Sequence, residues 1–100
     1  MSLKEVFLEP IHLGVKTTEY RDMTPYWADK LLNIAAYGMP VEEVIDGLMH
    51  GDLEVKPKGW THIRFHQSGG NRTLLVEMGE IKTYPGRHTF CISLGKLVKE

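Results

Sequence analysis

The sequence predicts an α+β domain, built as a small mixed β-barrel with a helical insertion after its second strand. Apolar residues alternate with a period of two towards both ends of the chain, which is typical of strands with one buried face. In the middle, apolar residues recur every three or four positions, which is typical of helices. The length of 100 residues and the hydrophobic content of 42% suit one globular domain spanning residues 1–100.

The first third of the chain predicts two short strands around a helical turn. Lys4 to Leu8 is apolar enough for a first strand. Pro10 then begins a helical turn in which His12 is an exposed spacer, and Gly14 ends that turn in a left-handed conformation. Residues 17–22, with two β-branched residues and a tyrosine, predict the second strand.

Two helices are expected next. Thr24 is a suitable N-cap with Pro25 at the first helical position, and apolar residues continue on one face until Gly38: Trp27, Leu31, Ile34 and Ala35. A second helix follows Pro40 and ends at Gly51. Its apolar stripe has the best helical spacing in the chain: Val41, Val44, Ile45, Leu48 and Met49. The acidic residues off that stripe, Glu42, Glu43 and Asp46, are interpreted as a solvated face.

From Trp60 the apolar period changes to two, which predicts a β-hairpin and a final strand. Thr61, Ile63 and Phe65 share the face opposite Trp60, His62, Arg64 and His66. A glycine-rich turn over residues 67–72 leads into a strand over 73–78. A turn over 84–87 precedes a last strand over 89–94, with Phe90, Ile92 and Leu94 directed inward.

Composition limits the function classes. Twelve basic and 13 acidic residues give a net charge of −1, so binding of nucleic acid would need a local basic patch. The single Cys91 cannot form an internal disulfide, and no apolar run has membrane-spanning length, so the expected location is the cytoplasm. His62 and His66, four strand residues and about 13 Å apart, are too distant to bind one metal ion. No metal and no cofactor is therefore expected.

The most informative stretch is G-x-K-x-x-E-x-R, formed by Gly14, Lys16, Glu19 and Arg21. Strand alternation places Glu19 and Arg21 on one face, while Lys16 reaches in from the start of the strand. Two cations held by one carboxylate suit a phosphate, a carboxylate or the edge of a nucleobase. The alternative is an ordinary solvated strand that carries charges of both signs.

Followed by Thr24-Pro25-Tyr26-Trp27, this motif resembles the signature of ASCH domains, small barrels related to the PUA RNA-binding domains. The resemblance extends over most of the chain, including His62-Ile63-Arg64-Phe65, Asn71-Arg72 and Leu75-Val76-Glu77. It implies a PUA-like barrel with a polar cleft beside the motif and RNA or a nucleotide-like small molecule as the partner. The residues expected to contact that ligand are Lys16, Glu19, Arg21, Tyr26, Trp27, Arg64, Arg72 and Glu77.

A second hypothesis is a small amidohydrolase, because one type of ASCH protein removes acyl groups from acylated cytidines. Lys16 matches its catalytic lysine, and burial beside Arg21 would favour the neutral amine that a general base requires. Glu19 stands where that type has a threonine and would orient the lysine or a water molecule. Glu77 is the candidate for the distant glutamate. A third hypothesis is that the charged cluster only stabilises the barrel and that the protein binds another protein.

Overall fold

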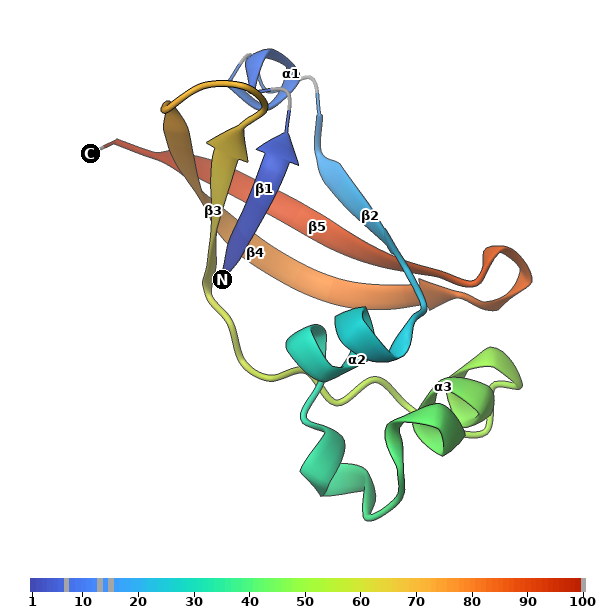
Figure 1. Ribbon diagram of the computed structural model, residues 1–100. Coiled ribbons are helices and arrows are strands. Elements are labelled where there is room, and N and C mark those ends of the chain that lie inside the picture. Colours follow the sequence, from blue (N-terminus) through green and yellow to red (C-terminus); the bar gives the residue numbers. More distant parts are fainter. Residues whose placement is uncertain (7, 13, 15, 100) are drawn as a thin grey trace. The chain divides into compact units, whose positions relative to one another are not determined.

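The computed structural model describes residues 1–6, 8–12, 14 and 16–99 (Figure 1). Along the chain, the strands and helices are β1 (Ser2–Val6), α1 (Glu9–His12), β2 (Thr18–Asp22), α2 (Pro25–Leu31), the 3-10 helix η1 (Ile34–Tyr37), α3 (Val41–Met49), β3 (His62–Gln67), β4 (Thr73–Tyr84), the 3-10 helix η2 (Pro85–Arg87) and β5 (Thr89–Val98). The predicted α+β class, with helices inserted after the second strand, is confirmed.

The strands form one five-stranded sheet in the order β1-β3-β4-β5-β2. The sheet is mixed, because β1 pairs with β3 in parallel whereas β3 pairs with β4 antiparallel. Leu3 lies opposite Phe65, and Ile63 lies opposite Val76, so apolar side chains from three strands meet on one face.

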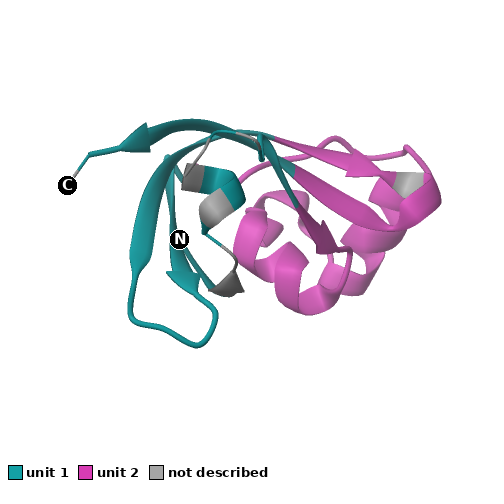
Figure 2. Cartoon of the chain, turned by 90° about the horizontal axis from the view of Figure 1, so that it is seen from above, with its two compact units in different colours: residues 1–19, 60–80, 92–100 teal, residues 20–59, 81–91 magenta. Residues whose placement is uncertain are grey.

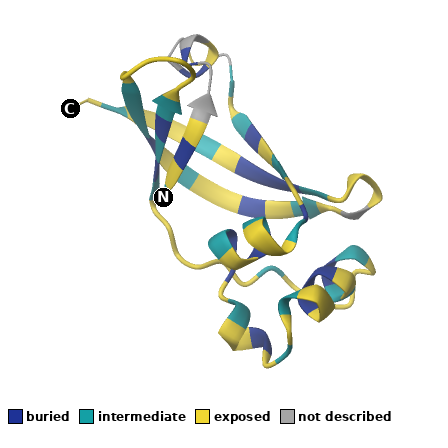
Figure 3. Cartoon of the chain, in the orientation of Figure 1, coloured by how far each residue is buried: buried dark blue, intermediate teal, exposed yellow. Residues whose placement is uncertain are grey.

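The chain divides into two compact units (Figure 2). Unit 1 comprises residues 1–19, 60–80 and 92–100, and unit 2 comprises residues 20–59 and 81–91. Each unit has its own buried apolar residues (Figure 3). Those of unit 1 are Leu3, Leu8, Ile11, Ile63, Phe65, Val76 and Ile92. Those of unit 2 are Met23, Ala28, Leu31, Leu32, Tyr37, Val44, Ile45, Leu48, Ile81, Phe90 and Cys91.

The predicted start of α2 is confirmed, but its predicted end at Gly38 is wrong. Thr24 has extended backbone, and its hydroxyl accepts a hydrogen bond from the Trp27 amide at 3.3 Å. The helix ends at Leu31 because Leu32 is extended and forms an isolated β-bridge with Pro57. Helix then resumes as η1, which Gly38 ends in the left-handed region at φ 66°.

This break changes which side chains of the segment are buried. Leu32 is fully buried and Tyr37 nearly so, whereas Ala35, which was expected on the apolar face, is exposed. The phenolic oxygen of Tyr37 donates a hydrogen bond to the Glu54 carbonyl and accepts one from the Lys56 amide, both at 2.7 Å. The polar connection after α3 is therefore attached to η1 by hydrogen bonds that helical periodicity does not predict.

Helix α3 follows its prediction closely. Val44, Ile45 and Leu48 are buried, and the three acidic residues of the opposite face are exposed, as expected for a solvated surface. Gly51 has φ 74°, in the left-handed region where glycine avoids steric strain. The helix contacts α2, η1 and η2, all within unit 2.

The strands deviate from their predicted lengths. β1 lies nearer the N-terminus than the predicted 4–8: it ends at Val6, Leu8 is buried outside it, and residues 7 and 13 of the predicted elements lie outside the described part of the chain. The predicted alternation in β3 is confirmed, since Ile63 and Phe65 are fully buried. Trp60, however, precedes the strand.

β4 and β5 both continue beyond the predicted ranges. Gly79 and Gly95 lie inside these strands, each one residue beyond the predicted strand end. A Cβ atom at Gly79 would lie 3.1 Å from the Cβ of Ser93, and one at Gly95 would lie 3.1 Å from the Cβ of Glu77. Glycine therefore permits close strand contact at both positions rather than ending the strands.

Candidate functional site

The first part of the motif forms an ion pair within unit 1. The Nζ atom of Lys16 lies 2.7 Å from Oε2 of Glu19. Glu19 is buried, with 4% of the residue exposed, whereas about a third of the Lys16 side chain remains accessible. A buried carboxylate is costly unless it is compensated, so Lys16 supplies charge that Glu19 requires. The predicted approach of Lys16 to the strand is confirmed.

Backbone contacts in the preceding turn position this lysine. Gly14 has φ 72°, the left-handed conformation expected from the sequence, and its amide donates to the Ile11 carbonyl at 3.1 Å. The Lys16 amide in turn donates to the Pro10 carbonyl at 2.9 Å. The Thr17 carbonyl accepts from the Leu94 amide at 2.9 Å, which joins the end of the turn to β5.

Lys16 also lines a cleft of about 210 Å³ in unit 1. The residues around it come from α1, the motif turn, β4 and β5: Ile11, Gly14, Lys16, Thr17, Val76, Leu94, Gly95, Lys96 and Leu97. Ligand pockets commonly occupy about 300–1,000 Å³, so this cleft is small for a nucleoside. It suits a small polar group next to the ion pair.

The second part of the motif belongs to unit 2 and lies against α2. The guanidinium carbon of Arg21 is 5.0 Å from the centre of the Trp27 ring, a cation–π distance. The rings of Tyr26 and Trp27 meet edge to face with centroids 5.0 Å apart. The Nζ atom of Lys30 lies 5.6 Å from both ring centres. These four residues, Arg21, Tyr26, Trp27 and Lys30, are here called the α2 patch.

Exposure differs between the two rings of the α2 patch. Tyr26 is 64% exposed, whereas Trp27 is half-buried. Trp27 therefore serves mainly as a surface on which Arg21 rests, and Tyr26 presents the more accessible ring. Lys30 was not among the residues expected from the sequence. The sequence could have predicted its position beside Tyr26. Lys30 follows Tyr26 by four residues on a helix, and this spacing places side chains on one face.

The remaining expected residues lie on or near the β3–β4 hairpin of unit 1. Nη1 of Arg64 donates a hydrogen bond to Oγ1 of Thr73 at 3.1 Å. Glu77 is exposed and lies opposite His62 in the antiparallel register, so its face of the sheet also carries Arg64. Arg72 is exposed in the turn, and its carbonyl accepts from the Gln67 amide at 2.9 Å.

Within the two units, all of the expected ligand-binding residues except Arg72, which is exposed in the β3–β4 turn, fall into three groups of neighbours. Lys16 pairs with Glu19, Arg21 lies with the aromatic residues of α2, and Arg64 shares a strand face with Glu77. The first and third groups belong to unit 1, and the second belongs to unit 2. The contribution of each group to ligand binding is therefore considered separately.

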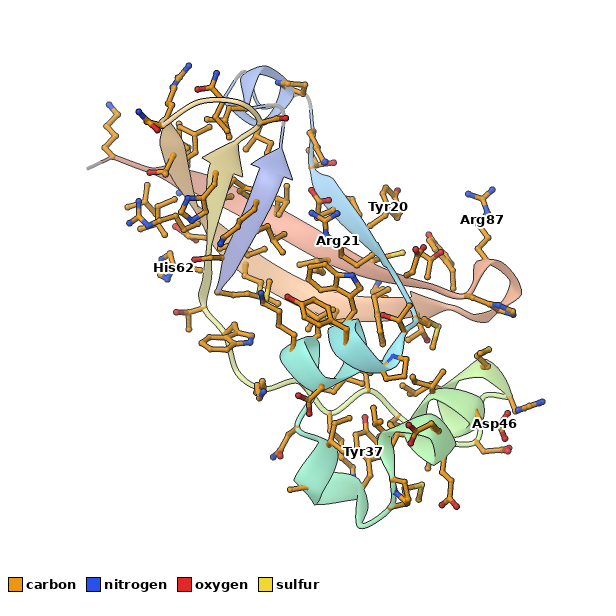
Figure 4. The ribbon with its side chains drawn as sticks, in the orientation of Figure 1. Tyr20, Arg21, Tyr37, Asp46, His62 and Arg87 are labelled. Carbon is orange, nitrogen blue, oxygen red and sulfur yellow. The ribbon has the colours of Figure 1, made fainter. Side chains whose placement is uncertain are left out.

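Two groups in unit 2 have perturbed acidity. Burial raises the pKa of the Cys91 thiol, and the positive charge of Arg87 opposes this effect. Burial also raises the pKa of the Tyr37 phenol, and its hydrogen bond from the Lys56 backbone opposes that shift. Figure 4 shows Tyr37 at the end of η1 and Arg87 at the β4–β5 turn.

The described residues contain no cluster of three or more His, Cys, Asp or Glu side chains arranged to hold a metal ion. In the same part of the chain, no helix combines the length and the apolar character needed to traverse a bilayer. Comparison with protein-family models, with curated proteins and with solved structures finds no match to this chain.

Proposed function

We propose that this protein is an ASCH-type, PUA-like domain that binds RNA or a nucleotide, with the α2 patch as its principal contact surface. The observation that supports the proposal is the arrangement of two aromatic rings and two cations within one patch. Stacking on aromatic side chains and cation contacts dominate the recognition of single-stranded nucleic acid.

Each residue of the patch has a distinct role in this proposal. A nucleobase stacks on Tyr26, the most exposed ring, while Trp27 supports the Arg21 guanidinium from below. Arg21 and Lys30 then meet phosphate oxygens, for which guanidinium and ammonium groups are the usual protein donors. This local basic surface satisfies the requirement set by a net charge of −1 for the whole chain.

The Lys16–Glu19 pair contributes less charge to such binding. Because a carboxylate lies 2.7 Å from the ammonium, the two charges largely cancel at a distance. Lys16 retains further donor capacity, since an ammonium has three hydrogens, and it can offer a hydrogen bond at the edge of the 210 Å³ cleft. Its proposed role is therefore local and polar.

Fluorescence anisotropy with a short labelled single-stranded RNA tests the proposal. Loss of one stacked base costs about 1–3 kcal/mol, so Tyr26→Ala should weaken binding by roughly tenfold or more. Lys30→Ala should lower the salt dependence of log K by about 0.7 if it removes one phosphate contact. Trp60→Ala and Lys4→Ala, which lie outside the patch, are the matched controls. An unchanged Kd for Tyr26→Ala, with its circular dichroism intact, would remove the patch from RNA binding.

The amidohydrolase alternative receives less support from the geometry. Lys16 is held in an ion pair with Glu19 at 2.7 Å, which restricts its approach to a substrate. The adjoining cleft is also small for an acylated nucleoside. Turnover of acylated cytidine nucleosides by purified protein is therefore expected to be absent. Turnover that Lys16→Ala abolishes would reverse this conclusion and identify Lys16 as catalytic.

A further inference from the structure

Unit 2 contains a larger hollow that involves none of the residues assigned above. It occupies about 410 Å³ and is lined by Tyr20, Tyr84, Gly86 and Arg87. A second hollow of about 260 Å³ shares both tyrosines and Arg87 and adds Thr89. The two are therefore parts of one surface feature, here called the tyrosine hollow. Its volume lies within the range of small-ligand pockets.

The two tyrosine side chains that line the hollow are largely exposed to solvent. Tyr20 is 54% exposed and Tyr84 is 53% exposed, so each retains an accessible aromatic surface. Figure 4 shows Tyr20 and Arg87 projecting on the same side of the ribbon, away from α2. Strand alternation explains the position of Tyr20, because its neighbours Glu19 and Arg21 point to the opposite face of β2. The tyrosine hollow and the α2 patch thus use opposite faces of that strand.

Backbone contacts hold the two sides of the hollow together. The Met23 amide, just after β2, donates to the His88 carbonyl at 2.8 Å. Oγ1 of Thr89 donates to the Arg87 carbonyl at 2.8 Å, and His88 has φ 50°, a left-handed conformation that tightens the turn. The loop that carries Arg87 is therefore fixed against the strand that carries Tyr20, which lowers the ordering cost of binding.

The chemistry of the lining indicates the class of ligand. Two phenol rings offer flat apolar surfaces with polar rims, which suit a planar aromatic ligand. Arg87 adds a planar cation that matches phosphate oxygens in a bidentate geometry. Among the described residues that line the two hollows, Arg87 carries the charge and none is a carboxylate, so these residues present a positive charge to a ligand. A planar ring joined to a phosphate satisfies both features at once.

We propose that the tyrosine hollow binds a nucleotide, with the base against Tyr20 and Tyr84 and the phosphate on Arg87. The inference goes beyond the proposed function, because the hollow shares no residue with the α2 patch. It holds for a free mononucleotide whether or not the α2 patch binds RNA.

Isothermal titration calorimetry with adenosine monophosphate, adenosine and inorganic phosphate as separate probes tests the inference. Adenosine monophosphate should bind more tightly than either fragment. Tyr84→Ala should weaken adenosine monophosphate and adenosine alike by about tenfold, because both rely on stacking. Arg87→Ala should weaken adenosine monophosphate by about tenfold and leave adenosine unchanged.

Gly86 offers a third variant that acts by occupying space. A Cβ atom at this position would meet no atom within 4 Å, so the side chain of Gly86→Leu begins in open space and adds bulk to the hollow. This variant should abolish binding of the nucleotide while circular dichroism remains that of the wild type. Trp60→Ala, an exposed ring that belongs to neither the hollow nor the α2 patch, is the control and should bind the mononucleotide normally.

The possible outcomes separate this inference from the proposed function. Loss of mononucleotide binding in Tyr84→Ala, Arg87→Ala and Gly86→Leu, with Trp60→Ala unaffected, supports a nucleotide site in the hollow. Equal affinities of wild type and all three variants would overturn it, as would a wild-type protein that binds no adenosine monophosphate. Loss of binding in Tyr26→Ala alone would also overturn it and would assign the nucleotide to the α2 patch.

Discussion

The hydrogen bonds of Tyr37 give a direct test of how the helical insertion is stabilised. Its hydroxyl is both donor to the Glu54 carbonyl and acceptor from the Lys56 amide, each at 2.7 Å. The substitution Tyr37→Phe keeps the buried ring and its contact with the Lys56 ammonium, 5.0 Å from the ring centre. It removes only the two hydrogen bonds, so any loss of stability is assigned to them.

The expected loss in the free energy of unfolding is about 2 kcal/mol. A neutral hydrogen bond contributes about 1 kcal/mol net, and two are lost. Tyr37 is 9% exposed, whereas Glu54 and Lys56 are exposed, so water partly satisfies the backbone groups that the substitution leaves behind. For a domain of this size the midpoint of thermal unfolding should fall by roughly 10 °C.

Urea and thermal unfolding, followed by far-ultraviolet circular dichroism, measure this loss. Tyr26→Phe is the matched control, because Tyr26 is 64% exposed and removal of its hydroxyl should change stability by less than about 0.5 kcal/mol. A loss in Tyr37→Phe no larger than that of the control would refute the role assigned to the hydroxyl.

The same residue predicts a dependence on alkaline pH. Burial raises the pKa of Tyr37 above its ordinary value of 10.0, so the unfolded chain releases this proton first as the pH rises. The contribution to stability is therefore complete below pH 10.0 and is lost as the pH climbs towards the folded-state pKa. The difference between wild type and Tyr37→Phe isolates this effect, since Cys91 titrates in both. If the difference in unfolding free energy between wild type and Tyr37→Phe does not decrease above pH 10.0, the predicted pH dependence is wrong.

Three further predictions follow from local contacts. Thr24→Ala should lower stability by about 1 kcal/mol in urea unfolding, because it removes the N-cap acceptor of α2, whereas Thr24→Ser should retain most of it. Lys16→Met should lower the free energy of unfolding by roughly 2 kcal/mol, because it removes the cation 2.7 Å from the Glu19 carboxylate. This loss is smaller than that expected for a fully buried ion pair, because Lys16 is partly exposed. Equal stability of Lys16→Met and Lys4→Met would contradict the prediction. Cys91, with its raised pKa and 7% exposure, should react with a thiol reagent much more slowly in folded than in urea-unfolded protein, and equal rates would show that the thiol is accessible.

The helix signals in the sequence proved reliable where they depend on neighbouring residues. The cap at Thr24 and the apolar stripe of α3 were predicted correctly, because an N-cap and a helical face are decided within one or two turns. The predicted continuation of α2 to Gly38 was wrong, because its end depends on a contact with a distant segment. Leu32 leaves the helix to form a bridge with Pro57, a partner that lies on the far side of α3 in the sequence.

In the candidate sites, too, local features were predicted from the sequence and long-range contacts were not. Sequence alone identified the charged motif and the approach of Lys16 to its strand, because these residues are separated by only a few positions. Strand alternation within residues 17–22 places Tyr20 on the face opposite Glu19, but it gives no reason to join Tyr20 to Tyr84 and Arg87. That grouping depends on the pairing of β2 with β5, which long-range backbone hydrogen bonds determine.

The sequence by itself therefore determined the α+β class, the N-cap at Thr24 and the buried faces of α3 and β3, since periodicity and capping are local properties of the chain. Tertiary structure alone decided the strand order, the break at Leu32 and the tyrosine hollow. The physical reason is that these features follow from contacts between segments distant along the chain. These features are stabilised by burial and by backbone pairing between segments that meet only when the chain folds. Local residue patterns therefore do not predict them.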